Sequence, residues 1–102
     1  MKSSPANTEC AQLLKSLADA TRLRIVHALF KQDLCVSDLV RRLRQSQPHV
    51  SHHLKILKNS GIIDFQRHGQ KVYYRLTSRM RSKFGRDKRT ISLKCCSIVF
   101  KG

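Results

Sequence analysis

Apolar positions in the first third of the chain recur with the period of an α-helix. One set has the i, i+3, i+4, i+7 spacing of an amphipathic helix over residues 7–18, with Asn7 or Thr8 as its cap: Cys10, Leu13, Leu14 and Leu17. A wider stripe predicts a second helix over residues 20–31, placed centrally in the core: Leu23, Ile25, Val26, Leu29 and Phe30.

Two more helices follow at short intervals. A helix over residues 38–43, capped by Ser37, would bury Val36, Leu39, Val40 and Leu43. After a turn at Arg44-Gln45, Ser46 is a second cap candidate, and Pro48 is tolerated in a first helical turn. This helix runs to about residue 59, ends at Gly61, and buries Val50, Leu54 and Leu57.

The period then changes from helical to alternating. Ile63 and Phe65, and then Val72, Tyr74 and Leu76, alternate with polar residues around a basic turn that contains Gly69, which predicts a β-hairpin with its aromatic residues on the apolar side. Two short helices joined by a tight turn and followed by a hairpin are the plan of a winged helix-turn-helix. We therefore predict a mainly α, α+β fold, with this DNA-binding domain over residues 1–78.

Residues 79–102 form a predicted basic C-terminal extension. Met80 and Phe84 are spaced for one short helix, and the alternation over residues 89–102 predicts a β-strand, in place of the last helix that is usual in the family that the chain is shown below to resemble. The alternation changes phase at Cys95-Cys96, which predicts a bulge in that strand.

Charge identifies the kind of partner. The 102 residues include 21 Lys and Arg against 6 Asp and Glu, a net charge of +15, which favours nucleic acid. The charge is +2 over residues 1–35, +6 over 36–76 and +7 over 77–102. Apolar runs are too short to span a membrane and the N-terminus lacks the apolar stretch of a signal peptide, so we expect a cytoplasmic protein without a membrane partner.

The helix that starts at Ser46 carries the candidate chemistry for reading double-stranded DNA. Its outward side chains can meet base edges and phosphates in the major groove. The predicted DNA-binding residues of this helix are Ser46, Gln47, His49, Ser51, His52 and Lys55. Arg67, His68 and Lys71 at the hairpin tip are predicted to reach the minor groove or phosphates, and the cations Arg41, Arg42, Arg44 and Lys58 add non-specific attraction.

Three motifs together resemble the ArsR/SmtB repressor family over residues 9–76. They are Leu17-Ala18-Asp19-Ala20-Thr21-Arg22-Leu23-Arg24-Ile25, Leu34-Cys35-Val36-Ser37-Asp38-Leu39, and Gln45-Ser46-Gln47-Pro48-His49-Val50-Ser51-His52-His53-Leu54-Lys55-Ile56-Leu57, with Gly61-Ile62-Ile63 following. The resemblance implies a homodimeric repressor that binds a palindromic operator and is released by an inducer. It also implies that Gln47, Ser51 and His52 face the major groove and that the hairpin is the wing.

The cysteines are candidates for inducer sensing. Family members that sense metals often carry Cys-Val-Cys-Asp-Leu, whereas this chain has Ser37 in place of the second thiol. The family's other site uses Asp and His pairs that residues 77–102 lack. Cys95 and Cys96, with Cys10 or Cys35 as a third ligand, could bind a metal or metalloid or respond to thiol oxidation. The alternative is that these thiols are reduced, buried hydrophobic side chains, which we favour for Cys10.

Other functions have weaker support. An RNA- or ribosome-associated protein would use the same basic surface but usually adds exposed aromatic side chains. An enzyme is not expected, since the chain has no glycine-rich phosphate loop and no paired carboxylates. The i, i+4 pair His49 and His53 could hold a metal, but we interpret it as solvated or structural. We interpret His27 as a satisfied core or interface histidine.

Overall fold

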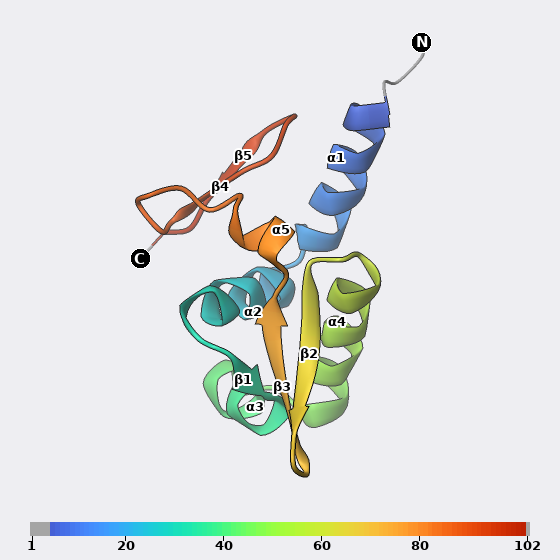
Figure 1. The fold of residues 1–102 in the computed structure, drawn as a ribbon, viewed down its shortest axis with the longest axis vertical. Helices are drawn as coiled ribbons and strands as arrows, with labels where there is room; N and C mark the ends of the chain where they lie inside the picture. Colours follow the sequence, from blue (N-terminus) through green and yellow to red (C-terminus); the bar gives the residue numbers. More distant parts are fainter. Residues whose placement is uncertain (1–4, 102) are drawn as a thin grey trace.

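The computed structural model describes residues 5–101. Figure 1 shows the helices gathered around one sheet, with a separate small hairpin beside the first helix. In chain order the elements are α1 (Pro5–Leu17), α2 (Ala20–Lys31), β1 (Leu34–Cys35), α3 (Val36–Leu43), α4 (Gln47–Asn59), β2 (Ile63–His68), β3 (Lys71–Leu76), α5 (Ser78–Arg81), β4 (Thr90–Ser92) and β5 (Ser97–Val99). The α+β class and the winged helix-turn-helix plan are confirmed.

Helix α2 lies at the centre of the core. Asp19 caps it, with the Asp19 side chain accepting a hydrogen bond from the backbone N–H of Arg22 at 3.0 Å. Ile25, Val26 and Leu29 on α2 have no exposed surface. The predicted bounds, residues 20–31, match those of α2. The wide apolar stripe of this helix is buried because other elements pack on several of its sides.

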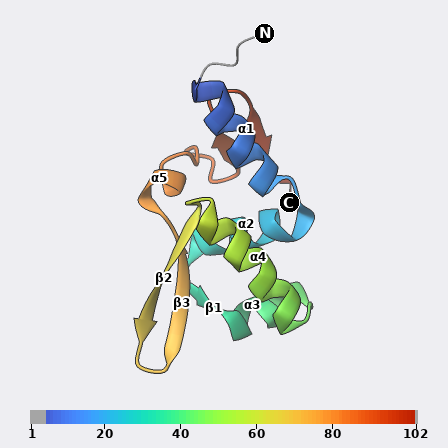
Figure 2. The same ribbon diagram turned by 90° about the vertical axis from the view of Figure 1, so that its right-hand side faces the viewer.

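The wing is a three-stranded antiparallel sheet in the order β1-β3-β2. β2 and β3 pair from Ile63 with Leu76 to His68 with Lys71, and β1 adds to the other edge of β3 (Figure 2). Gly69 has φ +64° at the first position of the two-residue turn, where a tight hairpin favours glycine. Gly61 ends the preceding helix with φ +74°, as predicted.

Two helix starts differ from the sequence prediction. α1 begins at Pro5, so Asn7 and Thr8 lie inside it rather than capping it. α3 begins at Val36 with Cys35 as its N-cap, so the predicted cap Ser37 lies in the first turn instead. Asp38 accounts for the shift, because its Oδ2 accepts a hydrogen bond from the backbone N–H of Cys35 at 3.3 Å.

The predicted C-terminal strand is a hairpin rather than one bulged strand. β4 and β5 pair antiparallel from Thr90 with Val99 to Ser92 with Ser97. The N–H of Leu93 donates to the carbonyl of Cys96 at 2.8 Å across the turn between them. The change of phase at Cys95-Cys96 therefore marks a reversal of the chain, not a bulge.

Aromatic side chains dock this tail hairpin (residues 90–99) on α2. The rings of Phe30 and Phe84 stack at 4.0 Å, and Phe100 stacks on His27 at 4.5 Å. Burial is the main cause that lowers the pKa of His27, with the charges of Lys31 and Arg89 acting in the same direction. Ile91 of β4 is fully buried in the main core, so the residues after the predicted boundary at 78 pack on the domain itself.

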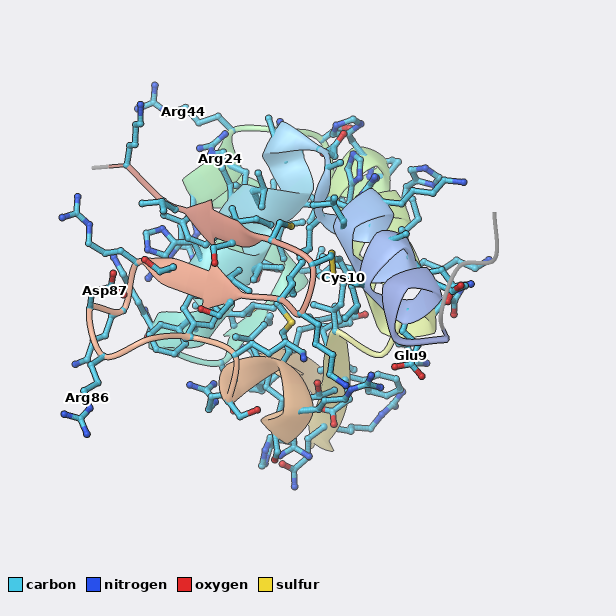
Figure 3. The ribbon with its side chains drawn as sticks, turned by 90° about the horizontal axis from the view of Figure 1, so that it is seen from above. Glu9, Cys10, Arg24, Arg44, Arg86 and Asp87 are labelled. Atoms are coloured by element: carbon cyan, nitrogen blue, oxygen red, sulfur yellow. A yellow bond between two sulfur atoms is a disulfide. The ribbon has the colours of Figure 1, made fainter. Side chains whose placement is uncertain are left out.

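A disulfide fastens the turn of the tail hairpin to α1. Cys10 and Cys95 are joined across 85 positions of sequence, with their Cα atoms 6.0 Å apart. In Figure 3, Cys10 lies where α1 meets the hairpin turn. The expectation that all thiols are reduced is wrong for this pair, because the chain reversal at 93–96 brings Cys95 onto the buried face of α1.

Reducing this bond should destabilise the fold. A cross-link that closes a loop of this length removes unfolded-state entropy worth up to about 4.5 kcal/mol in the chain-entropy description. Urea unfolding with and without dithiothreitol should show a lower midpoint for the reduced chain. The unfolding midpoint of Cys10→Ser should equal that of the reduced wild type. The midpoint of Cys96→Ser should fall on reduction by as much as that of the wild type. Equal midpoints for the oxidised wild type and Cys10→Ser would contradict this prediction.

Candidate nucleic-acid interface

The turn between α3 and α4 sets the angle of the helix that we predict to read DNA. Arg44 ends α3 in the left-handed region, with φ +56°. Ser46 caps α4 as predicted, its Oγ accepting a hydrogen bond from the N–H of His49 at 3.3 Å. Pro48 lies in the first turn of α4, where its missing N–H has no helical partner.

Polar side chains from the first turns of α2 hold this turn in place. Thr21 Oγ1 and the amide of Gln45 exchange hydrogen bonds of 3.0 and 3.2 Å. The guanidinium of Arg24 donates to the backbone carbonyl oxygens of Arg42 and Leu43, each at 3.4 Å. Residues that suggested the family resemblance thus connect the central helix to the helix-turn-helix.

Most of the predicted contact residues of α4 are open to a ligand. Ser46, Gln47, His49, His52 and Lys55 are exposed, and Ser51 is half-buried. In Figures 1 and 2 the start of α4 and the tip of the wing lie toward the same end of the molecule. Arg67, His68 and Lys71 at the wing tip are all exposed. The structure therefore brings the two predicted sets of contact residues to one end of the domain.

One aromatic side chain departs from its predicted place. Phe65 of β2 was expected on the apolar side of the hairpin, but it is 41% exposed. The ammonium group of Lys58 lies 4.3 Å from the centre of its ring. The Phe65 ring lies 6.0 Å from that of Tyr74, its partner in the alternating pattern, but these two neighbours leave much of it open to solvent.

Sequence reasoning missed the part played by His53. Its side chain points into the domain beside the apolar stripe of α4, and the residue is only 6% exposed. Arg22 contacts its Nδ1 at 3.1 Å. The signal was the helical spacing, since His53 lies three residues after the buried Val50 and four before the buried Leu57.

The structure separates the four cysteines into two places. Cys10, Cys95 and Cys96 meet at the tail hairpin, where the sulfur atoms of Cys95 and Cys96 lie 3.9 Å apart. Cys35 is buried at β1, with its sulfur 3.1 Å from Asp38 Oδ2, at the other end of the domain in both ribbon views. Within one chain, Cys35 therefore lies apart from the tail cysteines.

These donors do not suit a metal ion as the structure has them. Metal binding by cysteine requires the thiolate, and the sulfurs of Cys10 and Cys95 are bonded to each other. Within residues 5–101 no group of three or more His, Cys, Asp or Glu side chains is arranged to hold a metal.

Comparison with known proteins places this arrangement in a family. Residues 19–64, which span α2, α3 and α4, match the family model "Bacterial regulatory protein, arsR family". The solved structure of HlyU from Vibrio cholerae superimposes with a TM-score of 0.73 at 30% identity, covering 78% of this chain and 88% of that one. The chain belongs to the ArsR family. The resemblance identified from its motifs is therefore confirmed.

Two further relatives show the extent of the similarity. The arsenical resistance operon repressor of Escherichia coli is 49% identical over 67 residues, which are 65% of this chain and 57% of that protein. This ArsR-family chain thus spans little more than half of that curated relative. The homodimeric winged helix-turn-helix domain Mb0332 of Mycobacterium bovis shares the fold, with a TM-score of 0.68 at 24% identity, covering 78% of each chain.

Across residues 5–101, no helix combines the length and apolar character needed to cross a bilayer.

The cap of α4 should contribute measurably to stability. Ser46→Ala removes the side-chain acceptor for the N–H of His49, and we expect the free energy of unfolding to fall by about 1 kcal/mol. Ser46→Asp keeps an acceptor and adds a favourable charge at the helix start, so it should restore most of this loss. Thermal unfolding of the three proteins measures the effect, and equal losses for Ala and Asp would rule out capping as its cause.

Proposed function

We propose that this chain is a sequence-specific transcriptional repressor that inserts the first half of α4 into the major groove of duplex DNA. The observation that carries the proposal is the grouping of the exposed side chains of α4 with the exposed basic wing tip at one end of the domain. A reader helix and a wing in this arrangement can contact one face of a duplex together.

Each predicted contact has a chemical role in this proposal. Gln47 can pair with adenine through two hydrogen bonds, and Ser51 and His52 can each donate to or accept from a base edge. Ser46 and the N-terminal amides of α4 suit a phosphate oxygen, and so does His49. Lys55, Arg67, His68 and Lys71 add charge that attracts the phosphate backbone or a narrow minor groove.

We infer a homodimer that binds a palindromic operator, because a two-fold protein matches two half-sites one helical turn apart. The shared fold of the homodimeric Mb0332 domain supports this. Leu14 of α1 and Val99 of β5 are large apolar side chains that remain 37% and 62% exposed. They lie on elements at the end opposite the wing, where a second copy would leave both reader helices free.

RNA binding is the second candidate, and the exposed ring of Phe65 is the observation that favours it. An exposed aromatic beside a cation can stack on an unpaired base. Phe65 is the one Phe or Tyr ring among residues 8–101 that is more than about a third exposed, whereas RNA-binding sheets present several. Duplex DNA therefore remains the better-supported ligand.

The inducer in this proposal is a thiol oxidant acting on Cys10 and Cys95. A cytoplasmic location, which we infer for a repressor, keeps thiols reduced, so a disulfide there is usually transient and regulatory. Hydrogen peroxide would take two electrons and two protons from the two thiols, giving the disulfide and two waters. The disulfide is connected to the reader helix α4 through α1. The hydroxyl of Ser16 on α1 forms a 2.6 Å hydrogen bond with the hydroxyl of Ser60, the C-cap residue of α4.

The first test separates specific reading from backbone attraction. The probe is a duplex selected from a random pool by the wild-type chain, and a scrambled duplex of the same composition is the reference. In the double variant Ser51→Ala with His52→Ala, the ratio of the two dissociation constants should fall by at least tenfold, because two base-edge partners are lost. Binding to scrambled DNA should be unchanged. Arg67→Ala is the control and should weaken both duplexes alike. If transfer RNA competes as well as the selected duplex, the RNA-binding candidate is correct instead.

The second test concerns release by oxidation. Peroxide should weaken binding of the reduced wild type to the selected duplex by at least fivefold, a typical coupling between two sites. Cys10→Ser and Cys95→Ser should each abolish this response, whereas Cys35→Ser and Cys96→Ser should keep it. Arsenite, zinc and copper(I) serve as comparison inducers, and release by these in Cys10→Ser would point to metal sensing. Peroxide release that persists in Cys95→Ser would exclude the disulfide as the switch.

A further inference from the structure

His53 is a polar residue in an apolar position. It lies on the inward face of α4 between fully buried neighbours, and its side chain is only 7% exposed. A buried imidazole without a partner would destabilise the fold. The partner here is the guanidinium of Arg22, whose NH1 lies 3.1 Å from Nδ1 of His53.

This contact fixes the protonation state of His53. A guanidinium has donors only and keeps its charge in proteins, so Nδ1 must accept the hydrogen bond. The imidazole is then neutral, with its proton on Nε2. A proton on Nδ1 would set two donors against each other at this contact, and in the doubly protonated ring it would also set two positive charges against each other.

Arg22 holds more than the reader helix. Its Nε donates to the backbone carbonyl of Ser16 at the end of α1, and its own backbone N–H donates to Asp19. One planar side chain thereby joins α1, the start of α2 and the middle of α4. The rings of His49 and His52, two of the proposed reading side chains, pack edge-on against His53 at 4.6 and 5.5 Å.

We propose that Arg22 and neutral His53 are positioning residues for DNA reading, which hold α4 and the His49 and His52 rings at the angle that the major groove requires. This inference rests on the proposed DNA-binding function. Arg22 and His53 touch no base in this arrangement. They set specificity by fixing the side chains that do.

The contact should depend on pH. Among the described residues, the charged or titratable groups that face His53 are Asp19, Arg22, His49 and His52. Burial is the largest influence and lowers the pKa of His53, Asp19 at 3.9 Å opposes it, and His49, Arg22 and His52 lower the pKa further. Because the pKa is depressed in the folded state, the contact is intact at the ordinary histidine value of 6.5 and above, and it is lost as pH falls through the lower folded-state pKa.

The experiment measures specificity as a function of pH. A duplex is first selected from a random pool near pH 7.5 with the wild-type chain, which is kept reduced here and in every later measurement so that the proposed thiol switch does not act. The ratio of dissociation constants for a scrambled and the selected duplex is then followed from about pH 5 to 8. This ratio cancels any change with pH in the general attraction of the protein to the phosphate backbone.

Three variants and one control separate positioning from a merely structural role. The ammonium group of Arg22→Lys cannot reach both the Ser16 carbonyl oxygen and His53 Nδ1. The ratio of the scrambled to the selected dissociation constant near pH 7.5 should therefore fall by roughly tenfold. His53→Asn places an amide oxygen near the position of Nδ1, so specificity should survive and its fall at acid pH should disappear. Asp19→Asn keeps an N-cap but removes the compensating charge, so the midpoint should move to lower pH. His27→Asn, on the far face of α2, should leave the profile unchanged.

Imidazole nitrogen NMR of the free protein gives an independent measurement. His53 should carry its proton on Nε2 near pH 7.5, and a proton on Nδ1 there would overturn the proposal. Two other results would also overturn the proposal, provided that the wild type still prefers the selected duplex. One is a ratio of dissociation constants that Arg22→Lys leaves unchanged. The other is a pH midpoint of that ratio that Asp19→Asn does not move. If no duplex is enriched from the pool, the DNA-reading function itself is wrong, and the positioning role is lost with it.

Discussion

Burial of α2 is the interaction on which the other elements depend. Its apolar face, with Ile25, Val26 and Leu29 fully enclosed, meets β3 and the other helices of the domain. Its polar first turns then reach outward from this fixed position to Gln45, His53 and the end of α3. If α2 were not held in the core, the turn before α4 would lose these hydrogen bonds. The orientation of the reader helix therefore depends on the packing of α2 in the core.

The sequence predicted this part of the structure well because its signals are local. The apolar stripe of α2, the Ser46 cap and the left-handed Gly61 each depend on residues within a few positions of one another. The same holds for the exposure of Gln47 and His52, which follows from the helical period once the buried face of α4 is known.

Apart from the caps of α1 and α3, the predictions that were wrong concern contacts between distant segments. A bulge and a reversal both change the phase of an alternating pattern, and only the pairing of Thr90 with Val99 distinguishes them. The bond between Cys10 and Cys95 depends on that reversal, so composition could not reveal it. The partnership of His53 with Arg22 likewise joins positions 31 residues apart, although the buried position of His53 could have been read from its spacing.

The distribution of charge in space differs from its distribution along the chain. The tail carries +7, slightly more than the +6 of residues 36–76, yet the tail hairpin lies at the end of the molecule opposite the wing tip (Figure 1). The domain is 47 Å long, several times the screening length of about 8 Å at physiological ionic strength. Lys94, in the turn between β4 and β5, therefore lies at the end opposite the surface that we propose for DNA. In this proposal the charge that matters for reading DNA is the smaller set around α3, α4 and the wing, while the tail hairpin is tied to the domain by its disulfide and by aromatic contacts.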